Sequence, residues 1–331
     1  MRILVIGESN SVMKNGWVQG LKDELGDSSI IENYSIGSTG VLNLIFHLDK
    51  VKDHIGEYDH IFVDHLINDL TFYIDEKNFY FDILNNIYKY LVSTGVPVTS
   101  VFYRRHTLAP KFSCFLEEIQ DIIKNYPVEI FDTYQFLINQ GIKEGDIHTQ
   151  YKDSAHPFPE VSYKFGRFLG EVLNLNSGFK NDVSQRGYID NDFVFPFHVL
   201  RVDSLANPYD VYRVKNSLVD IQLVRVEDEL VLEIPAALID REVIGVLFNA
   251  STADGFVSFD GGVRKILSNG FYGKGATIWA RPLHSSKFSL SEKLNIKVER
   301  SASNFEFTEF TNKILLQGGA RLDLSSLIIQ L

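Results

Sequence analysis

The sequence has a single cysteine and no long apolar run. With only Cys114, the chain cannot form an internal disulfide or a zinc site built from several cysteines. Cys114 lies in an apolar part of a predicted helix, so we expect a packed core thiol rather than a nucleophile. No apolar run reaches the roughly 20 residues that span a bilayer, and Met1–Gly7 is too short for the core of a signal peptide. We therefore expect a cytoplasmic protein.

The chain also has fewer basic than acidic residues. The chain has 32 Lys and Arg against 43 Asp and Glu, a net charge of −11. Proteins that bind nucleic acids irrespective of sequence need a basic surface to replace counterions, and an anionic membrane repels an acidic protein. We expect neither a nucleic acid nor a membrane as a partner. The length of 331 residues exceeds the roughly 100–200 residues of a typical domain and predicts two domains.

Several functional signatures are missing as well. The G-x-S-x-G elbow of α/β-hydrolases, the P-loop and the dinucleotide-binding fingerprint do not occur in the chain. His54, His60, Asp64 and His65 lack a known spacing of metal ligands, so no metal site is expected.

Residues 1–178 alternate short apolar runs with amphipathic segments. The apolar runs predict buried strands at Ile3–Ile6, Ile30–Tyr34, His60–Val63, Val98–Tyr103 and Val128–Phe131. The amphipathic segments predict helices at Val12–Leu25, Gly40–Lys52, Phe79–Ser93, Phe112–Asn125 and Glu160–Leu173. Strands separated by such helices form a parallel sheet covered on both faces, which is a three-layer α/β/α domain. Ligands bind at the carboxyl ends of its strands.

Residues 190–331 instead show short alternating runs separated by glycine-containing turns. Val219–Val226 and Val243–Phe248 are examples, and the pattern predicts an antiparallel β-sandwich or jelly roll. The polar stretch before it predicts the domain boundary. We expect an accessory domain that contributes no catalytic group. Whether it shapes substrate access, supports the first domain or mediates dimerisation stays open.

The loop after the first predicted strand carries a candidate nucleophile. Gly7 ends the strand, Ser9 follows two residues later, and a helix is expected to begin directly afterwards. This order places the Ser9 hydroxyl at the edge of the sheet, beside the unpaired N–H groups of the helix. Alternatively, Ser9 or Ser11 caps that helix.

Two further loops carry groups that can stabilise negative charge. Gly37 follows the second strand, where a glycine lets a backbone N–H approach a ligand closely. Asn68 follows the third strand, and its side-chain amide can donate to a developing oxyanion. A capped turn at Gly37 and an Asx turn at Asn68 fit these positions equally well.

A carboxylate and a histidine lie three residues apart before the last predicted helix. Asp153 can orient the imidazole of His156, and Pro157 stiffens the loop. Of the nine histidines, only His156 combines a local carboxylate with a loop position before a helix. Arg104 and Arg105 follow the fourth strand, where they can hold an anionic group of the substrate or be ordinary surface charge.

Four short segments, taken in chain order, resemble the four sequence blocks of the SGNH hydrolase superfamily, also called GDSL-like esterases. They are Ser9 within Gly-Glu-Ser-Asn-Ser, Gly37, Asn68 before an aspartate, and Asp153 three residues before His156. The resemblance covers residues 1–175 and implies the flavodoxin-like fold of that superfamily. It implies that Ser9 is the nucleophile and that His156 is the general base, oriented by Asp153. It also implies an oxyanion hole formed by the N–H groups of Ser9 and Gly37 and by the side chain of Asn68.

Two positions depart from the pattern of that superfamily. Glu8 replaces the aspartate of the first block and keeps its charge, whereas Leu66 stands where the third block has glycine. The Leu66 replacement is the sequence support for an alternative, a catalytically inactive carbohydrate-binding protein with the same fold.

The resemblance implies an enzyme that cleaves or transfers an O-acyl ester, and we expect an acetyl ester on a carbohydrate. Water as the acceptor makes an esterase. A sugar hydroxyl makes an O-acetyltransferase, for which acetyl-coenzyme A can be the donor. No other cofactor is expected. The expected partners are an acylated sugar and, as an open alternative, further copies of the chain in a homo-oligomer.

Overall fold

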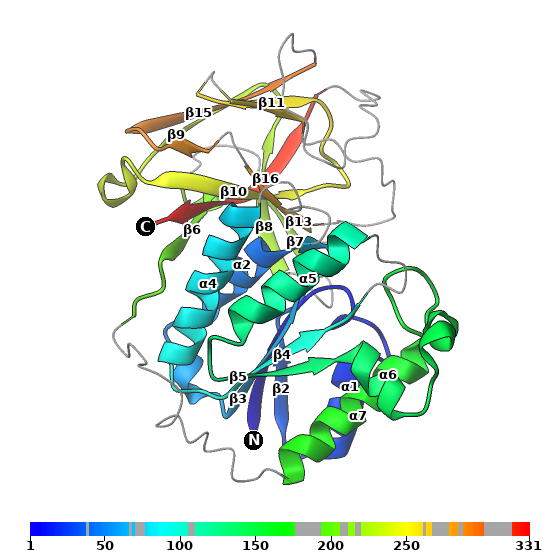
Figure 1. Cartoon of the computed structure of the whole chain (residues 1–331). Helices are drawn as coiled ribbons and strands as arrows, with labels where there is room; N and C mark the ends of the chain where they lie inside the picture. The colour runs from blue at the N-terminus through cyan, green and yellow to red at the C-terminus, as the bar shows by residue number, and fades with distance from the viewer. Residues whose placement is uncertain are drawn as a thin grey trace. The chain divides into compact units, whose positions relative to one another are not determined.

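The computed structural model describes residues 1–37, 40–65, 68–69, 77–104, 110–175, 193–205, 211–215, 220–260, 263–266, 278–283, 287–300 and 320–331 (Figure 1). The chain divides into two compact units, Met1–Phe195 and Pro196–Leu331. The expected start of the second domain, residue 190, lies outside the described residues. The first unit extends to Phe195, whose ring packs on that of Tyr90 with the centroids 4.7 Å apart.

A five-stranded parallel sheet forms the centre of the first unit, in the order β2-β1-β3-β4-β5. Its strands are β1 (Arg2–Ile6), β2 (Ile30–Asn33), β3 (His60–His65), β4 (Val98–Phe102) and β5 (Val128–Asp132). Strand β1 is a run of buried aliphatic residues, as expected between two helical layers. The predicted parallel α/β fold class is confirmed.

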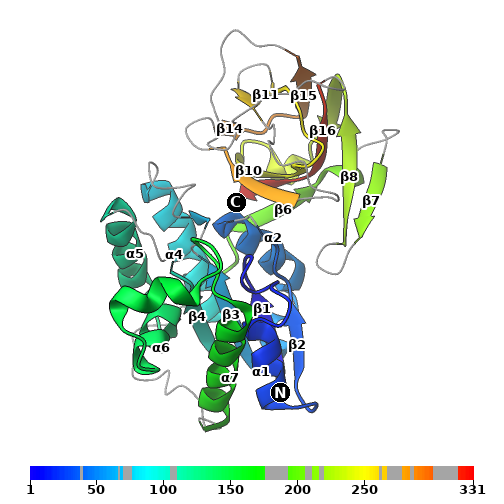
Figure 2. The same cartoon turned by 90° about the vertical axis from the view of Figure 1, so that its right-hand side faces the viewer.

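Helices cover both faces of this sheet (Figures 1 and 2). They are α1 (Trp17–Leu25), α2 (Val41–Val51), α4 (Lys77–Ser93), α5 (Pro110–Ile123), α6 (Thr133–Asn139) and α7 (Pro159–Leu175), with the short 3-10 helices η1 (Ile55–Glu57) and η2 (Glu144–Gln150). Helices α1, α6 and α7 share one core with the sheet, which includes Trp17, Phe136, Phe165 and the strand residues Val5 and Phe62. Helices α2, α4 and α5 cover the other face.

Helix α1 begins later than predicted, at Trp17 rather than Val12. Asn15 adopts a left-handed φ of 56°, and Gly16 is the N-cap without a side-chain hydrogen bond. Neither Ser9 nor Ser11 therefore caps α1. The N–H of Trp17 instead donates to the Ser162 hydroxyl of α7, at 3.1 Å.

The expectation that Cys114 is a core thiol is wrong, because this residue is exposed on α5. Phe115, Leu116 and Ile119 occupy the buried face of the same helix. The helical period leaves Cys114 outside that face.

Two helices of the first unit pack unusually closely, because glycines form the contact. A β-carbon on Gly20 of α1 would lie 2.1 Å from the carbonyl oxygen of Tyr163, and one on Gly166 of α7 would lie 1.9 Å from that of Trp17. Only glycine permits such an approach of two backbones. Helix α1 follows the Ser9 loop and α7 follows the His156 loop, so this contact sets the separation of the two loops.

The second unit consists of two antiparallel sheets. The seven-stranded sheet has the order β13-β10-β16-β8-β7, with β14 paired to β10 and β6 paired to β16. Its strands are β6 (Phe197–Arg201), β7 (Val211–Lys215), β8 (Asp220–Val226), β10 (Glu242–Asn249), β13 (Ile278–Pro282), β14 (Phe288–Ser289) and β16 (Leu322–Gln330). The four-stranded sheet, β12-β11-β15-β9, contains β9 (Glu229–Glu233), β11 (Phe256–Phe259), β12 (Val263–Ile266) and β15 (Lys293–Glu299).

One apolar cluster contains buried side chains of both sheets. Val246 and Leu327 come from the seven-stranded sheet, and Leu232 and Ile296 come from the four-stranded sheet. A core shared in this way makes the unit a sandwich of two sheets. The predicted antiparallel β-rich region is confirmed. None of the helices that the structure describes is long and apolar enough to cross a membrane.

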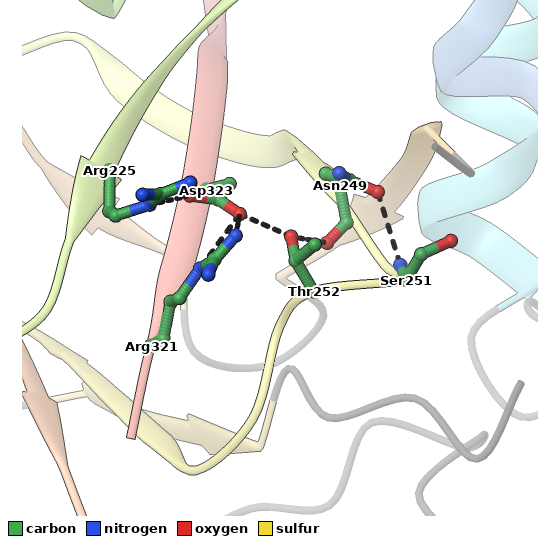
Figure 3. Close-up of polar contacts among 6 residues, drawn as sticks. All are labelled: Arg225, Asn249, Ser251, Thr252, Arg321 and Asp323. Atoms are coloured by element: carbon green, nitrogen blue, oxygen red, sulfur yellow. Dashed lines mark hydrogen bonds and ion pairs between the residues drawn. The ribbon is translucent and has the colours of Figure 1, made fainter. Parts of the chain in front are cut away.

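Strand β16 carries a fully buried carboxylate, Asp323 (Figure 3). Arg225 Nε lies 3.2 Å from Oδ1, Arg321 Nη2 lies 2.6 Å from Oδ2, and the Thr252 hydroxyl donates to the same carboxylate. Burial raises the pKa of Asp323, but the hydrogen bonds from Arg321 and Thr252 lower it more, and the pKa lies below its ordinary value. The two guanidinium groups compensate the charge that the sandwich buries.

Candidate active site

The loop after β1 forms a tight turn around Ser9. The N–H of Ser11 donates to the carbonyl oxygen of Glu8 at 3.1 Å, which places Ser9 and Asn10 at the two central positions. The carbonyl oxygen of Gly7 accepts from Asn43 Nδ2 at 3.1 Å and from the N–H of Ile36 at 3.1 Å. The turn at the carboxyl end of β1 is therefore connected to α2 and to the loop after β2.

His156 lies within hydrogen-bond distance of both Ser9 and Asp153. Its Nε2 is 2.7 Å from Ser9 Oγ, and its Nδ1 is 2.8 Å from Asp153 Oδ1. An ionised carboxylate only accepts, so Nδ1 carries the proton of the neutral ring and Nε2 is left to accept from the Ser9 hydroxyl. This is the protonation state that a general base needs. Residues 147 positions apart in the sequence meet here.

Asp153 also organises the loop that carries the histidine. Its Oδ1 accepts from the N–H groups of Ala155 and His156, both at 2.9 Å. Burial raises the pKa of the Asp153 carboxyl, but the hydrogen bonds from Ala155 and His156 outweigh it and leave the pKa below its ordinary value. Asp153 is therefore ionised at neutral pH. The side chain of His156 is 26% exposed, so the imidazole can be reached from solvent.

Gly37 is brought next to Ser9. A β-carbon on Gly37 would lie 3.6 Å from Ser9 Cβ and 3.7 Å from Ser9 Cα. The backbone of the loop after β2 thus borders the nucleophile turn.

Asn68 is brought to Glu8, the neighbour of Ser9. Its Nδ2 donates to Glu8 Oε2 at 2.6 Å, and its backbone N–H donates to the same oxygen at 3.2 Å. Glu8 is one methylene longer than the aspartate it replaces, and its carboxylate contacts Asn68 of the third block. Leu66, the other departure, lies outside the described residues.

Glu8 is one of three carboxyl groups buried beneath the turn, with Asp64 and Asp69. Burial is the main cause that raises the pKa of Glu8 well above its usual range, and the charges of Asp69 and Asp64 raise it further. Asp69 accepts from the N–H of Val41 at 2.7 Å and from the Tyr80 hydroxyl at 3.2 Å. It thereby joins the loop after β3 to the first turn of α2.

Asp64 makes a contact that sequence reasoning missed. Ser11 Oγ donates to Asp64 Oδ2 at 2.5 Å, and Trp17 Nε1 donates to Ser11 Oγ at 3.2 Å. Burial raises the pKa of Asp64 to about 7. Ser11 is 2% exposed and its hydroxyl both donates and accepts, so it is not placed to attack a substrate. An acidic residue directly after the apolar run Ile61–Val63 is the sequence signal that could have drawn attention to Asp64.

Of the two arginines after β4, Arg104 pairs with another group than Ser9. Arg104 Nε lies 2.5 Å from Asp132 Oδ2, and the guanidinium lies over the Tyr134 ring. Arg105 lies outside the described residues. Within the described part of the chain, no three His, Cys, Asp or Glu side chains are arranged to hold a metal ion.

No protein-family model and no curated protein matches the chain. Solved structures match its N-terminal half at low sequence identity. A lipolytic protein of the G-D-S-L family from Veillonella parvula is 16% identical with a TM-score of 0.41, over 54% of this chain and 98% of its own. The psychrotrophic esterase EstA from a Pseudoalteromonas species is 17% identical with a TM-score of 0.41, over 53% and 98%.

An acetyl-xylooligosaccharide esterase from a Geobacillus species is 14% identical, with a TM-score of 0.41 over 54% of this chain and 95% of its own. The second unit lies outside these matches, which cover little more than half of the chain. Over its N-terminal half, the chain has structural counterparts among the GDSL and SGNH hydrolases.

Proposed function

We propose that the first unit is a serine enzyme that cleaves or transfers O-acyl esters. Ser9 is the nucleophile, His156 is the general base, and Asp153 orients the imidazole. The observation that carries this proposal is the continuous hydrogen-bond chain from Ser9 Oγ through the His156 ring to Asp153, at 2.7 and 2.8 Å. A hydroxyl paired with a base that is itself oriented by a carboxylate is the arrangement that activates serine.

In the first step, Ser9 Oγ forms a bond to the ester carbonyl carbon while its proton moves to His156 Nε2. The electron pair of the carbonyl bond goes to the carbonyl oxygen, which becomes an oxyanion. We assign the donors for this oxyanion to the N–H groups of Ser9 and Gly37 and to the Asn68 amide, because both loops border the Ser9 turn. The imidazolium that forms is stabilised by ionised Asp153.

In the second step, the oxyanion re-forms the carbonyl double bond while the bond from that carbon to the leaving group breaks. Nε2 gives its proton to the leaving atom, which is the oxygen of an alcohol or the sulfur of coenzyme A. This leaves an acyl group on Ser9. His156 Nε2 then takes a proton from water or from a sugar hydroxyl while the oxygen of that acceptor forms a bond to the acyl carbon. The bond from this carbon to Ser9 Oγ breaks and Oγ regains the proton from Nε2, which releases the acid or the new ester. The same three residues serve both outcomes.

For the substrate, we propose an acetyl ester on a carbohydrate, with acetyl-coenzyme A as the donor if the enzyme is a transferase. This proposal is supported by the resemblance of the four sequence blocks to the SGNH superfamily and by the β-rich second unit. The alternative of an inactive carbohydrate-binding protein requires that catalysis has been lost. The assembled chain of Ser9, His156 and Asp153 speaks against that alternative.

The test is hydrolysis of p-nitrophenyl acetate by the full chain. Ser9→Ala and His156→Ala are each expected to lower kcat about 10³-fold or more, and the double variant little further, because the two groups act as one unit. Ser154→Ala is the matched control, since it removes an exposed hydroxyl from the His156 loop. A reactive phosphonate is expected to label the peptide that contains Ser9. Turnover retained in Ser9→Ala would contradict the proposal.

A second assay separates hydrolysis from transfer. Release of free coenzyme A from acetyl-coenzyme A only when a sugar acceptor is present would support a transferase. Release of acetate from acetylated sugars without another acceptor would support an esterase.

A further inference from the structure

A buried carboxylate holds the end of the turn that carries Ser9. Asp64 accepts from the Ser11 hydroxyl at 2.5 Å, and the backbone N–H groups of Glu8 and Ser11 lower the pKa of its carboxyl. Glu8 and Ser11 are the first and last residues of the turn, and Ser9 lies between them. A side chain of β3 thus fixes the last residue of the turn, next to its two central residues.

The same turn is held tightly from its other sides. Trp17 Nε1 donates to Ser11 Oγ at 3.2 Å, and Asn33 Nδ2 donates to the Ser11 carbonyl oxygen at 2.7 Å. A β-carbon on Gly7 would lie 2.5 Å from Ser11 Oγ and 2.8 Å from Asp64 Cβ. Gly7 therefore lies against both the hydroxyl and the carboxylate, and a larger residue at this position would displace them.

Burying a carboxylate in this place opposes folding. Asp64 is 1% exposed, and the Ser11 hydroxyl that donates to it is a neutral group. An aliphatic residue would fill an interior strand without this cost. A buried polar network that costs stability is typical of sites where geometry serves function.

We propose that Asp64 and Ser11 are positioning residues, which hold the turn so that Ser9 Oγ stays within hydrogen-bond distance of His156 Nε2. The inference rests on the proposed function of Ser9 and His156. A displacement of about 1 Å at a reacting group can cost about 10²-fold in rate. The Ser9–His156 distance of 2.7 Å thus requires a rigid turn. Neither positioning residue touches the substrate.

The experiment compares two equally buried serines in the full chain. Ser11→Ala removes the hydroxyl between Asp64 and Trp17, whereas Ser100→Ala removes a hydroxyl that pairs with Tyr88 at 2.8 Å on another part of the sheet. Both serines are at most 2% exposed, so both variants lose buried hydrogen bonds, two in Ser11→Ala and one in Ser100→Ala. We measure kcat and KM for p-nitrophenyl acetate, the urea midpoint and the rate of phosphonate labelling of Ser9.

Ser11→Ala is expected to lower kcat and the labelling rate about 10- to 100-fold with little change in KM. Ser100→Ala is expected to keep kcat within twofold, with a comparable shift of the urea midpoint. Asp64→Asn, a variant of nearly the same shape, is expected to lower kcat in the same way and gives the answer if Ser11→Ala does not fold.

Unchanged kcat in both Ser11→Ala and Asp64→Asn would overturn the positioning role, and so would an equal loss of kcat in Ser100→Ala. A phosphonate adduct on Ser11 instead of Ser9 would overturn both this inference and the proposed nucleophile. Failure of the proposed function is recognised separately, because the unaltered protein would then show neither ester turnover nor an adduct. That result would remove the basis of the positioning role as well.

Discussion

Gly166 lies against Trp17 so closely that a β-carbon on Gly166 would come within 1.9 Å of the Trp17 carbonyl oxygen. Helix α1, which begins at Trp17, follows the turn of Ser9, and α7, which contains Gly166, begins three residues after His156. The Ser162 hydroxyl of α7 also accepts from the Trp17 N–H at 3.1 Å. The spacing of two helices thus controls the spacing of two reacting groups.

Gly166→Ala is expected to force α1 and α7 apart. Overpacking of a core usually costs about 1–3 kcal/mol of unfolding free energy, and a clash with backbone lies at the upper end. We also expect kcat to fall, because the separation of Ser9 from His156 increases. Gly56→Ala is the control, since a β-carbon there meets nothing within 4 Å. Urea unfolding and ester turnover equal to those of the unaltered protein would contradict this account.

Asp153→Asn is expected to lower kcat less than loss of Ser9 or His156, with little change in KM. The carboxylate stabilises the imidazolium and accepts three N–H groups, and an amide oxygen retains part of the second role. Steady-state kinetics of the variant give kcat and KM separately. A large rise in KM with unchanged kcat would show that Asp153 serves substrate binding instead.

Asp64→Asn is expected to gain stability relative to the unaltered protein as the pH rises from 4 to 7. The pKa of Asp64 is about 7 in the fold against an ordinary value of 3.8, so the native state keeps a proton that the unfolded state has released. Ionising Asp64 therefore destabilises the fold by at most about 1.4 kcal/mol per pH unit in this range. Glu8 and Tyr103 are titratable groups whose charges interact with the charge of Asp64.

The measurement is urea unfolding of both proteins at pH 5 and pH 8. The buried His60, whose pKa burial lowers to about 4, acts in the opposite direction, but it is common to both proteins and cancels. A difference in unfolding free energy that does not change with pH would show that Asp64 does not titrate in this range.

Asp323→Asn is expected to destabilise the second unit by about 1–3 kcal/mol. The change leaves Arg225 and Arg321 without their shared countercharge, and their side chains are only about 30% exposed. Asp220→Asn, which breaks an exposed pair with Arg213, is the control and is expected to leave the unfolding temperature almost unchanged. Thermal unfolding measures both, and a control that costs as much would contradict the role of burial.

Residues 1–195 alone are expected to hydrolyse p-nitrophenyl acetate at a rate close to that of the full chain. Ser9, Asp153 and His156 all lie in the compact unit that ends at Phe195. Circular dichroism and Trp17 fluorescence establish whether the shortened chain is folded. A folded but inactive first unit would show that the second unit supplies a required group.

Sequence patterns predicted the sheet of the first unit because its strands are short apolar runs between helices. The start of α1 could not be read in this way, since Val12 and Met13 continue the apolar spacing although Asn15 and Gly16 turn the chain. The pairing of Asp153 with His156 could be predicted because the two residues are close together in the sequence. Ser11 and Asp64 lie 53 residues apart, and only the register of the sheet brings them together.

Strand β16 was not predicted, although it is the central strand of its sheet. Asp323, Ser325 and Ser326 are buried there and interrupt the alternation that identifies a strand. Their burial depends on distant partners, such as Arg225, which is 98 residues away. A sequence window contains no information on such partners, so the segment shows no strand pattern.

The position of β16 in the chain has a consequence for how the second unit folds. Residues Leu322–Gln330 pair with β10, β8 and β6, so the seven-stranded sheet lacks its centre until this segment has been synthesised. The strands that are synthesised earlier keep unpaired edges until then, and pairings over such long sequence separations form slowly. The first unit, whose strands pair in near-sequential order, contains all of its own sheet by Asp132 and can fold on the ribosome while the second is still being made.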